Sequence, residues 1–173
     1  PTRSGYTFAG WCQDVGLTVP ATSQTIINSN TDFYAKWIEN ITVTYNAKSG
    51  SVYPTSVTFP SGSAIGELPV PTRPGYGFIG WYLDDETYLN EVTSATTFNS
   101  TTSIYAKWEE LPDITISFDA DGGTAVPNSI TMRPDFAIGS LPTISNSPDQ
   151  TSNIFVGWFI DDGTYSTEIT EET

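Results

Sequence analysis

An internal repeat limits what this chain can fold into more than any other feature of its sequence. Residues 1–11, PTRSGYTFAGW, recur about 70 residues later at 71–81 as PTRPGYGFIGW. The tetrapeptide YAKW occurs at 34–37 and again at 105–108, and the FIGW that ends the second copy returns as FVGW at 155–158. A chain that repeats itself in this way builds the same small module several times, so the pattern of one unit predicts the others.

Each complete unit has two halves. In the first half, an alternating strand at 41–45 and a second strand near 56–59 flank a turn. The second half contains the GYxFxGW strand, an acidic turn and a closing strand at 102–108. The predicted domains are residues 1–39, the second half of a repeat; residues 41–110, a complete repeat; and residues 113–173, a third repeat that stops before any YAKW strand. We therefore expect the sequence to be a piece of a longer protein.

The strand signals predict a mainly β fold (α+β at most), made of tandem small modules with little helix. Thr, Tyr, Val, Ile and Phe favour strands, and 14 Gly and 12 Pro interrupt the chain often. Strict alternation puts Phe78 and Trp81 on opposite faces of their strand and turns Ile104 and Trp108 inward. The glycines between bulky residues predict a β-bulge, or an aromatic ring lying across bare backbone. Residues 60–69 have room for at most one helical turn.

Charge and composition exclude several classes of function. The chain has 20 acidic and 6 basic side chains and a net charge of −14, so no basic surface is available for nucleic acid or an anionic membrane. No apolar run reaches the roughly 18 residues that span a bilayer, so direct membrane insertion is not expected. Without histidine, a His-based catalytic triad or metal site cannot form. Residues 109–173 hold 12 of the 20 acids and one of the six bases.

Aromatic residues at repeat-equivalent positions are the candidate structural core. They are Tyr6, Phe8, Trp11, Tyr34, Trp37, Tyr76, Phe78, Trp81, Tyr105, Trp108, Phe155 and Trp158. Because the same residue types return at the same places in each unit, core packing is favoured for them. An exposed Trp or Tyr platform that binds sugars is the alternative.

Three acidic clusters are predicted to be solvated hairpin turns. They lie at 84–86, 119–123 and 161–163, and Asp-Gly and Gly-Gly pairs favour tight turns. Calcium is the alternative, but none of the three has the ligand spacing of an EF-hand loop. A glycosidase would need two carboxyls facing each other across a cleft, for which small modules have no room. We therefore predict no catalytic residue, no cofactor, no metal and no enzyme.

The basic residues belong mostly to the repeat. Four of the six occupy equivalent positions in two units: Arg3 and Arg73, and Lys36 and Lys107. We expect each to pack its stem on a neighbouring aromatic ring and to pair with a carboxylate, with a ligand-binding cation as the alternative. The one cysteine, Cys12, has Tyr82 and Phe159 as equivalents, which predicts a semi-buried apolar position and not a nucleophile.

These motifs, in this order, resemble the Listeria–Bacteroides repeat, the internalin-type B repeat of bacterial surface proteins. The resemblance rests on RxGYxFxGW at 3–11 and 73–81, on the two YAKW strands, and on the ITVTYNAKSG stretch at 41–50 with its counterpart at 114–123. It implies a small β-grasp-like module, strung in tandem on cell-surface and secreted proteins, with no enzymatic activity. The third unit departs from the pattern, because residues 143–154 replace the expected TRPGY and lack its arginine.

The resemblance implies an extracellular array of repeats on a bacterial surface or secreted protein, acting as a stalk or spacer and in adhesion. Its expected partners are neighbouring repeats of the same or an adjacent chain, together with a surface glycan or a host protein. One alternative is a segment of an extracellular fibre or filament joined by strand addition, since residues 1–39 lack a first half and residues 113–173 lack a last strand. Another is a carbohydrate-binding accessory fragment.

Overall fold

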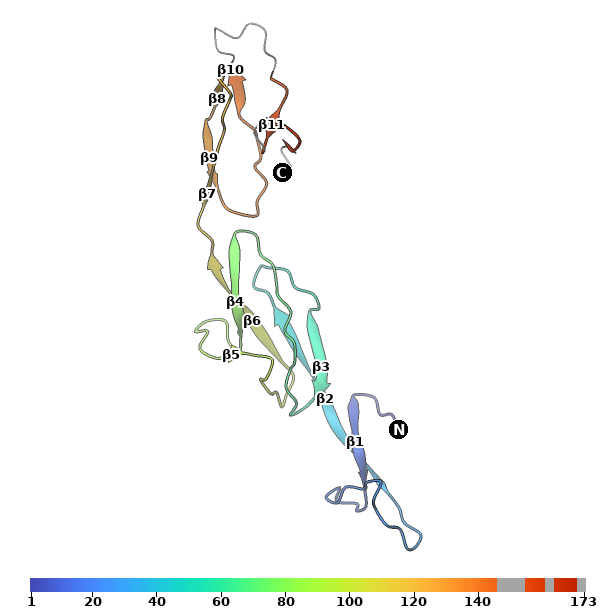
Figure 1. The fold of residues 1–173 in the computed structure, drawn as a ribbon. Coiled ribbons are helices and arrows are strands. Elements are labelled where there is room, and N and C mark those ends of the chain that lie inside the picture. The colour runs from blue at the N-terminus through green and yellow to red at the C-terminus, as the bar shows by residue number, and fades with distance from the viewer. Residues whose placement is uncertain (146–154, 161–163, 171–173) are drawn as a thin grey trace. The chain divides into compact units, whose positions relative to one another are not determined.

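The computed structural model describes residues 1–145, 155–160 and 164–170 (Figure 1). Every regular element among these residues is a β-strand, and none is a helix. The predicted mainly β class is therefore confirmed, while the likeness to a β-grasp stays a prediction. The chain divides into two compact units, one made of Pro1–Thr72 with Phe78–Trp108, the other of Arg73–Gly77 with Glu109–Thr173.

One six-stranded sheet organises the first unit. Its strands are β1 (Tyr6–Cys12), β2 (Tyr34–Asn46), β3 (Ser56–Pro60), β4 (Tyr76–Tyr82), β5 (Glu91–Val92) and β6 (Thr102–Glu110). Their order is β1-β2-β6-β4-β5, and β3 also pairs with β2. The β2–β6 pairing is parallel, with residues 43–46 against 102–105, whereas β1 and β3 pair with β2 in antiparallel fashion. The closing strand of the complete repeat therefore lies in the middle of the sheet.

Strand β2 is shared by two repeats. Its residues 34–39 pair with β1, and its residues 40–44 pair with β3. The closing strand of the first repeat thus runs into the opening strand of the second with no linker between them. At about 3.3 Å per residue, these 13 residues span roughly 43 Å.

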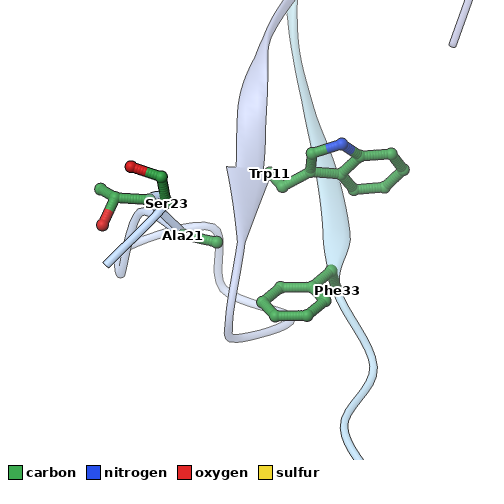
Figure 2. A pocket seen from close by; sticks show the side chains of 5 residues that line it. Trp11, Ala21, Ser23 and Phe33 are labelled. Carbon is green, nitrogen blue, oxygen red and sulfur yellow. The ribbon is translucent and has the colours of Figure 1, made fainter. Parts of the chain in front are cut away.

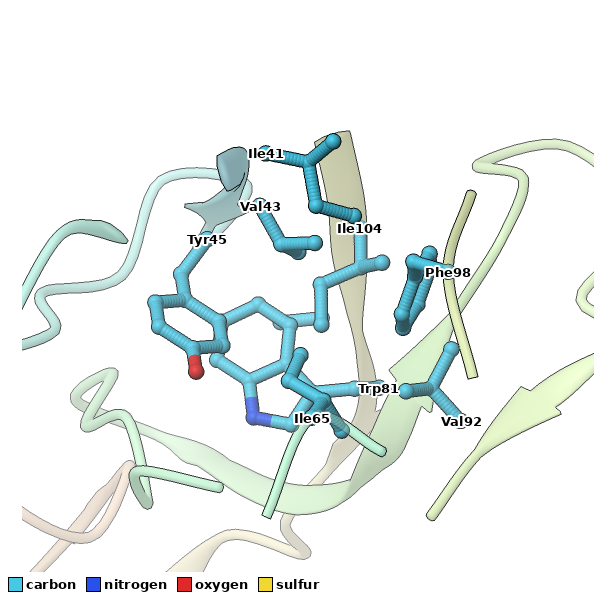
Figure 3. Close-up of a cluster of buried hydrophobic side chains, with 9 residues drawn as sticks. Ile41, Val43, Tyr45, Ile65, Trp81, Val92, Phe98 and Ile104 are labelled. Atoms are coloured by element: carbon cyan, nitrogen blue, oxygen red, sulfur yellow. The ribbon is translucent and has the colours of Figure 1, made fainter. Parts of the chain in front are cut away.

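The core of the complete repeat lies beneath this sheet (Figure 3). Val43 and Ile104 are fully buried and Trp81 is 2% exposed, so the predicted inward direction of Ile104 is confirmed. The buried members are Ile41, Val43, Tyr45, Ile65, Trp81, Val92, Phe98, Ile104 and Ala106, and Phe78 and Trp108 pack against them. Alternation along β2 and β6 supplies this face, because every second side chain points to the same side of a strand.

A bulge changes the face of the GYxFxGW strand, as the glycines predicted. In β1 the pairing shifts between Phe8 and Gly10, and Gly10 has a φ of 123°. The extra residue brings the rings of Phe8 and Trp11 together at 5.5 Å, and their counterparts Phe78 and Trp81 meet at 5.6 Å. The expectation that Phe78 and Trp81 lie on opposite faces is therefore wrong, because their rings meet as those of Phe8 and Trp11 do.

Residues 60–69 form no helical turn. The amides of Gly62 and Ile65 donate to the carbonyls of Phe98 at 2.7 Å and Thr96 at 2.9 Å. These backbone groups find partners in a neighbouring segment, so they do not need the local bonds of a helix.

The second unit repeats the first-half pattern. Its strands are β7 (Ile114–Ser117), β8 (Thr124–Val126), β9 (Ser129–Met132), β10 (Thr143–Ser145), β11 (Trp158–Phe159) and β12 (Glu168–Ile169). They pair as β7–β9, β8–β10 and β11–β12, all antiparallel. Phe118, Ala125 and Trp158 form the buried centre of this unit. Ile114 opposes Met132 in the register in which Ile41 opposes Phe59, so the two first halves are built alike.

Candidate functional site

A shallow apolar pocket of about 530 Å³ lies beside the first strand (Figure 2). Trp11, near the end of β1, and Phe33, just before β2, present their rings to it, and a loop with Ala21 and Ser23 lies opposite. The Trp11 side chain is 44% exposed and Phe33 is 38% exposed. Two accessible aromatic rings on a folded hairpin form a surface that can bind a ligand through ring faces and apolar contact.

The exposure of Trp11 corrects its assignment to the core. Its equivalent Trp81 packs on Tyr45, with ring centroids 5.2 Å apart, and donates its indole N–H to the Pro69 carbonyl at 2.8 Å. Both of those partners belong to a first half. Among the described residues the Trp11 ring packs on the Phe8 ring, with the centroids 5.5 Å apart, and no residue takes the place of Tyr45 or Pro69.

Tyr34 and Phe155 are the other exposed members of the predicted core, at 37% and 48%. Tyr34 starts a strand segment that pairs with β1 alone, whereas its equivalent Tyr105 lies in β6 between two strands. Phe155 corresponds to Phe78, whose ring packs on Trp108 at 5.6 Å, and no described residue of the second unit takes the place of Trp108.

The remaining predicted core aromatics are covered. Trp81 and Trp158 are buried, while Tyr6, Phe8, Trp37, Tyr76, Phe78, Tyr105 and Trp108 are half-buried. The indole N–H of Trp158 donates to the Pro142 carbonyl at 3.3 Å, and that of Trp108 donates to Ala47 at 2.9 Å. These tryptophans are held at both the ring and the nitrogen, as expected of structural anchors.

Three of the four repeat-equivalent cations pack on aromatic rings. The guanidinium of Arg3 lies 3.9 Å from the centre of the Tyr6 ring, and that of Arg73 lies 3.6 Å from Tyr76. The Lys107 ammonium lies over the rings of Tyr82 and Tyr88, at 5.3 and 5.5 Å. Lys36 instead donates to the Leu17 carbonyl at 3.5 Å. Among the described residues, no ion pair joins any of these four side chains to a carboxylate.

Two ion pairs among the described residues were not predicted from the sequence. Lys48 donates to Asp85 at 2.7 Å, and this bond raises the pKa of the lysine. In the second unit, Arg133 pairs with Glu110 and donates to the Tyr76 hydroxyl at 3.3 Å, which lowers the pKa of that phenol. Arg133 is the one base of residues 109–173. Its place among 12 acidic residues was the feature of the sequence from which an ion pair could have been predicted.

The acidic turns bind their own backbone. Asp84 accepts hydrogen bonds from the Thr87 hydroxyl and from the amides of Thr87 and Tyr88, at 2.7–2.9 Å, and its pKa falls to about 2. Asp14 accepts from Thr18 and Val19 in the same way, and the Val19 amide is the main cause of its lowered pKa. The cluster at 161–163 lies outside the described residues. Among the described residues, no group of three His, Cys, Asp or Glu side chains is placed to hold a metal ion.

Cys12 ends β1 and is 3% exposed, in keeping with an apolar packing position. Its thiol lies at the position of Tyr82 in the complete repeat and of Phe159 in the second unit.

No described helix is long and apolar enough to cross a membrane.

In the comparison with known proteins, the segments that match a family correspond to the three repeats. The family model described as the Listeria-Bacteroides repeat domain matches residues 1–36, 42–107 and 115–173. A protein of Evansella cellulosilytica named "Putative membrane protein" is 32% identical over 169 residues, which cover 94% of this chain and 24% of that protein. A "Putative Gly-rich membrane protein" of the same organism is 33% identical over 165 residues, 93% of this chain and 18% of its own length. No solved structure matches.

Proposed function

This chain belongs to the Listeria-Bacteroides repeat domain family, and from that membership we propose that it is a non-enzymatic spacer in a bacterial cell-envelope protein, with a role in adhesion. The names of its relatives support a place at the cell envelope. The chain spans about a quarter or less of the length of those relatives, which is what a repeated segment within a larger protein would do.

The shared strand β2 is the observation that carries the spacer role. A stalk must hold successive modules apart without collapsing, and its weakest points are the linkers. Here the backbone of β2 is paired with β1 on one side of the repeat boundary and with β3 and β6 on the other. Bending at that boundary would require ladder hydrogen bonds to break, so the two repeats of the first unit act as one stiff segment.

Spin-label distances test this stiffness. Labels at Ala9→Cys in β1 and Ser56→Cys in β3, in a Cys12→Ser background, straddle the boundary. We expect one narrow distance distribution, and a broad one after a Gly-Ser-Gly insertion between Glu39 and Asn40. A broad distribution in the chain without the insertion would overturn the spacer role, because the boundary would then behave as a flexible linker.

Sugar recognition is a second candidate, supported by the exposed rings of Trp11 and Phe33. Aromatic faces bind the apolar faces of sugar rings, and two rings beside a polar loop suit a short glycan. A glycan array probed with the full chain should give hits that Trp11→Ser removes. Val15→Ser, at a site that is 80% exposed outside the pocket, is the matched control and should keep them. An array without hits would end this candidate.

A further inference from the structure

The first and last strands of the complete repeat are neighbours in the sheet. The repeat opens with the second part of β2 and closes with β6. These two segments pair in parallel, with Val43 opposite Thr102 and Asn46 opposite Tyr105. The chain enters the repeat along β2, whose first part belongs to the preceding repeat, and it leaves along β6 toward β7. A force that stretches an array of repeats therefore acts on this pair through both of its strands.

The parallel direction decides how such a force acts on the hydrogen bonds between the strands. Tension pulls β2 toward its N-terminal end and β6 toward its C-terminal end, and for parallel neighbours these are opposite directions. The strands must then slide past one another, which strains all the bonds between them together. Strands drawn apart at one end would instead lose their bonds one after another. Forced unfolding follows the height of the unfolding barrier, so breaking several bonds at once requires the larger force.

Both strands of the pair are enclosed by the rest of the sheet and by the core. Strand β3 pairs with residues 40–44 of β2, and β4 neighbours β6 on its other side. The side chains of Val43 and Ile104 are fully buried in the core (Figure 3), as is that of Ala106. These neighbours limit the access of water to the pair. A strained bond is then not readily exchanged for a bond to solvent, so its loss keeps its full cost.

Side-chain hydrogen bonds fasten the pair at each end. At the start of the pair, the Thr42 amide donates to the Thr101 hydroxyl at 3.1 Å. Beyond its other end, the Trp108 indole donates to the Ala47 carbonyl at 2.9 Å. Bare backbone at Gly50 lets the Trp108 ring lie close, because a Cβ there would come within 2.7 Å of it. Each of these bonds joins the β2 side of the pair to the β6 side, so sliding must break them as well.

We propose that residues 43–46 of β2 and 102–105 of β6, with the two side-chain bonds at their ends, form a mechanical clamp that resists unfolding when the array of repeats is stretched. Every contact that forms the clamp lies within residues 40–110. The clamp deepens the proposed spacer role, and its use in the cell envelope rests on that role. Its strength is a separate property from the stiffness of the repeat boundary, because stiffness concerns bending and the clamp concerns rupture under tension.

Single-molecule pulling of the full chain tests the clamp by changing only the direction of the force. In a Cys12→Ser background, DNA handles at Glu39→Cys and Glu109→Cys make the two strands slide. Handles at Glu39→Cys and Ser100→Cys draw the same strands apart at one end. All three handle sites are exposed, and residues beyond 109 carry no tension in either arrangement. At the same pulling rate, the unfolding force should be about twofold or more higher in the sliding arrangement. Equal forces, or a lower force on sliding, would overturn the proposal.

A matched pair of core variants separates the clamp from stability in general. Val43→Ala shortens a buried side chain of β2 within the clamp, and Val92→Ala shortens one of β5, which pairs with β4. The two side chains are 0% and 3% exposed. Both variants should lose stability in urea, but only Val43→Ala should lower the sliding force. The contacts of Val92 are still intact when the clamp ruptures, so they do not contribute to that barrier.

The same loss of sliding force in both variants would contradict the clamp, because the force would then follow stability alone. The comparison of the two pulling directions uses neither variant, so it stands even where a core substitution prevents folding. Spin-label distances report bending at the repeat boundary, whereas the pulling forces report rupture within one repeat. The clamp can therefore fail while the stiff spacer stands, and the reverse is equally distinguishable.

Discussion

At the scale of single residues, identical amino acids in equivalent places have different roles here. Trp81 is enclosed by Tyr45 and hydrogen-bonded to Pro69, and Trp11 has neither partner and stays accessible. The strand motif that carries both is the same, so the motif alone does not decide which tryptophan stabilises the fold. The free energy of a buried side chain comes from the surfaces that close over it, and those belong to another half of the repeat.

The two tryptophans should therefore differ in their effect on stability. We expect Trp81→Ala to lower the free energy of unfolding of the first unit by about 3–5 kcal/mol, because a large buried ring is replaced by a cavity. Trp11→Ala should cost about 1 kcal/mol or less, since its ring is already partly in water. Urea unfolding of each variant checks this. Equal losses would show that Trp11 is buried in solution.

The acidic turn of Asp84 predicts a pH dependence. The pKa of this carboxyl falls from its ordinary value of 3.8 to about 2, because the Thr87 and Tyr88 donors favour the charged form. A depressed folded-state pKa adds stability that is present above about pH 4 and is lost as the pH falls toward 2. Asp84→Ala should therefore lower the melting temperature by a few degrees at pH 6 and have little effect near pH 2. A pH-independent difference would contradict this assignment.

At the scale of strands, much could be predicted from the sequence. Alternation located β2 and β6 and the inward Ile104, because a half-buried strand shows its period directly. Alternation also placed Phe78 and Trp81 on opposite faces, although their rings meet at 5.6 Å, because strict alternation assumes a regular strand. It also allowed a helical turn at residues 60–69, where the partners of the backbone amides lie on a distant segment. Local pattern predicts elements well and says little about contacts between them.

Two glycines in equivalent turns allow a test at this scale. Gly50→Ala should destabilise the first unit by about 1–3 kcal/mol, because its Cβ would lie 2.7 Å from both Trp108 and the Thr72 carbonyl. Gly123→Ala should cost under about 1 kcal/mol, since its closest contact is the Ala120 carbonyl at 3.1 Å. Chemical unfolding of the two variants measures both values, and a larger loss at Gly123 would contradict the difference in packing.

At the scale of the whole molecule, charge separates the two units. The second unit, residues 73–77 with 109–173, carries 12 acids and two bases, while the first unit carries eight acids and four bases. Like charges in a small unit repel one another and oppose compaction. The ion pair of Arg133 with Glu110 offsets only one of these negative charges.

Salt should therefore stabilise the two units unequally. Raising sodium chloride from about 0.02 M to 0.5 M shortens the screening length several-fold and weakens the repulsion in the second unit. We expect hydrogen exchange to slow more in β7 and β9 than in β2 and β3. Equal slowing in both units would show that the acidic excess does not limit the stability of the second.

The sequence by itself determined the repeat, the mainly β class, the family and the absence of a basic surface. Each of these follows from local pattern or from counts of residue types. Only the tertiary structure decided that Trp11 and Phe155 are exposed, that Arg133 binds Tyr76 and Glu110, and that β2 is shared by two repeats. Exposure and pairing depend on which distant segments come into contact, and the spacing of motifs along the sequence does not specify those contacts.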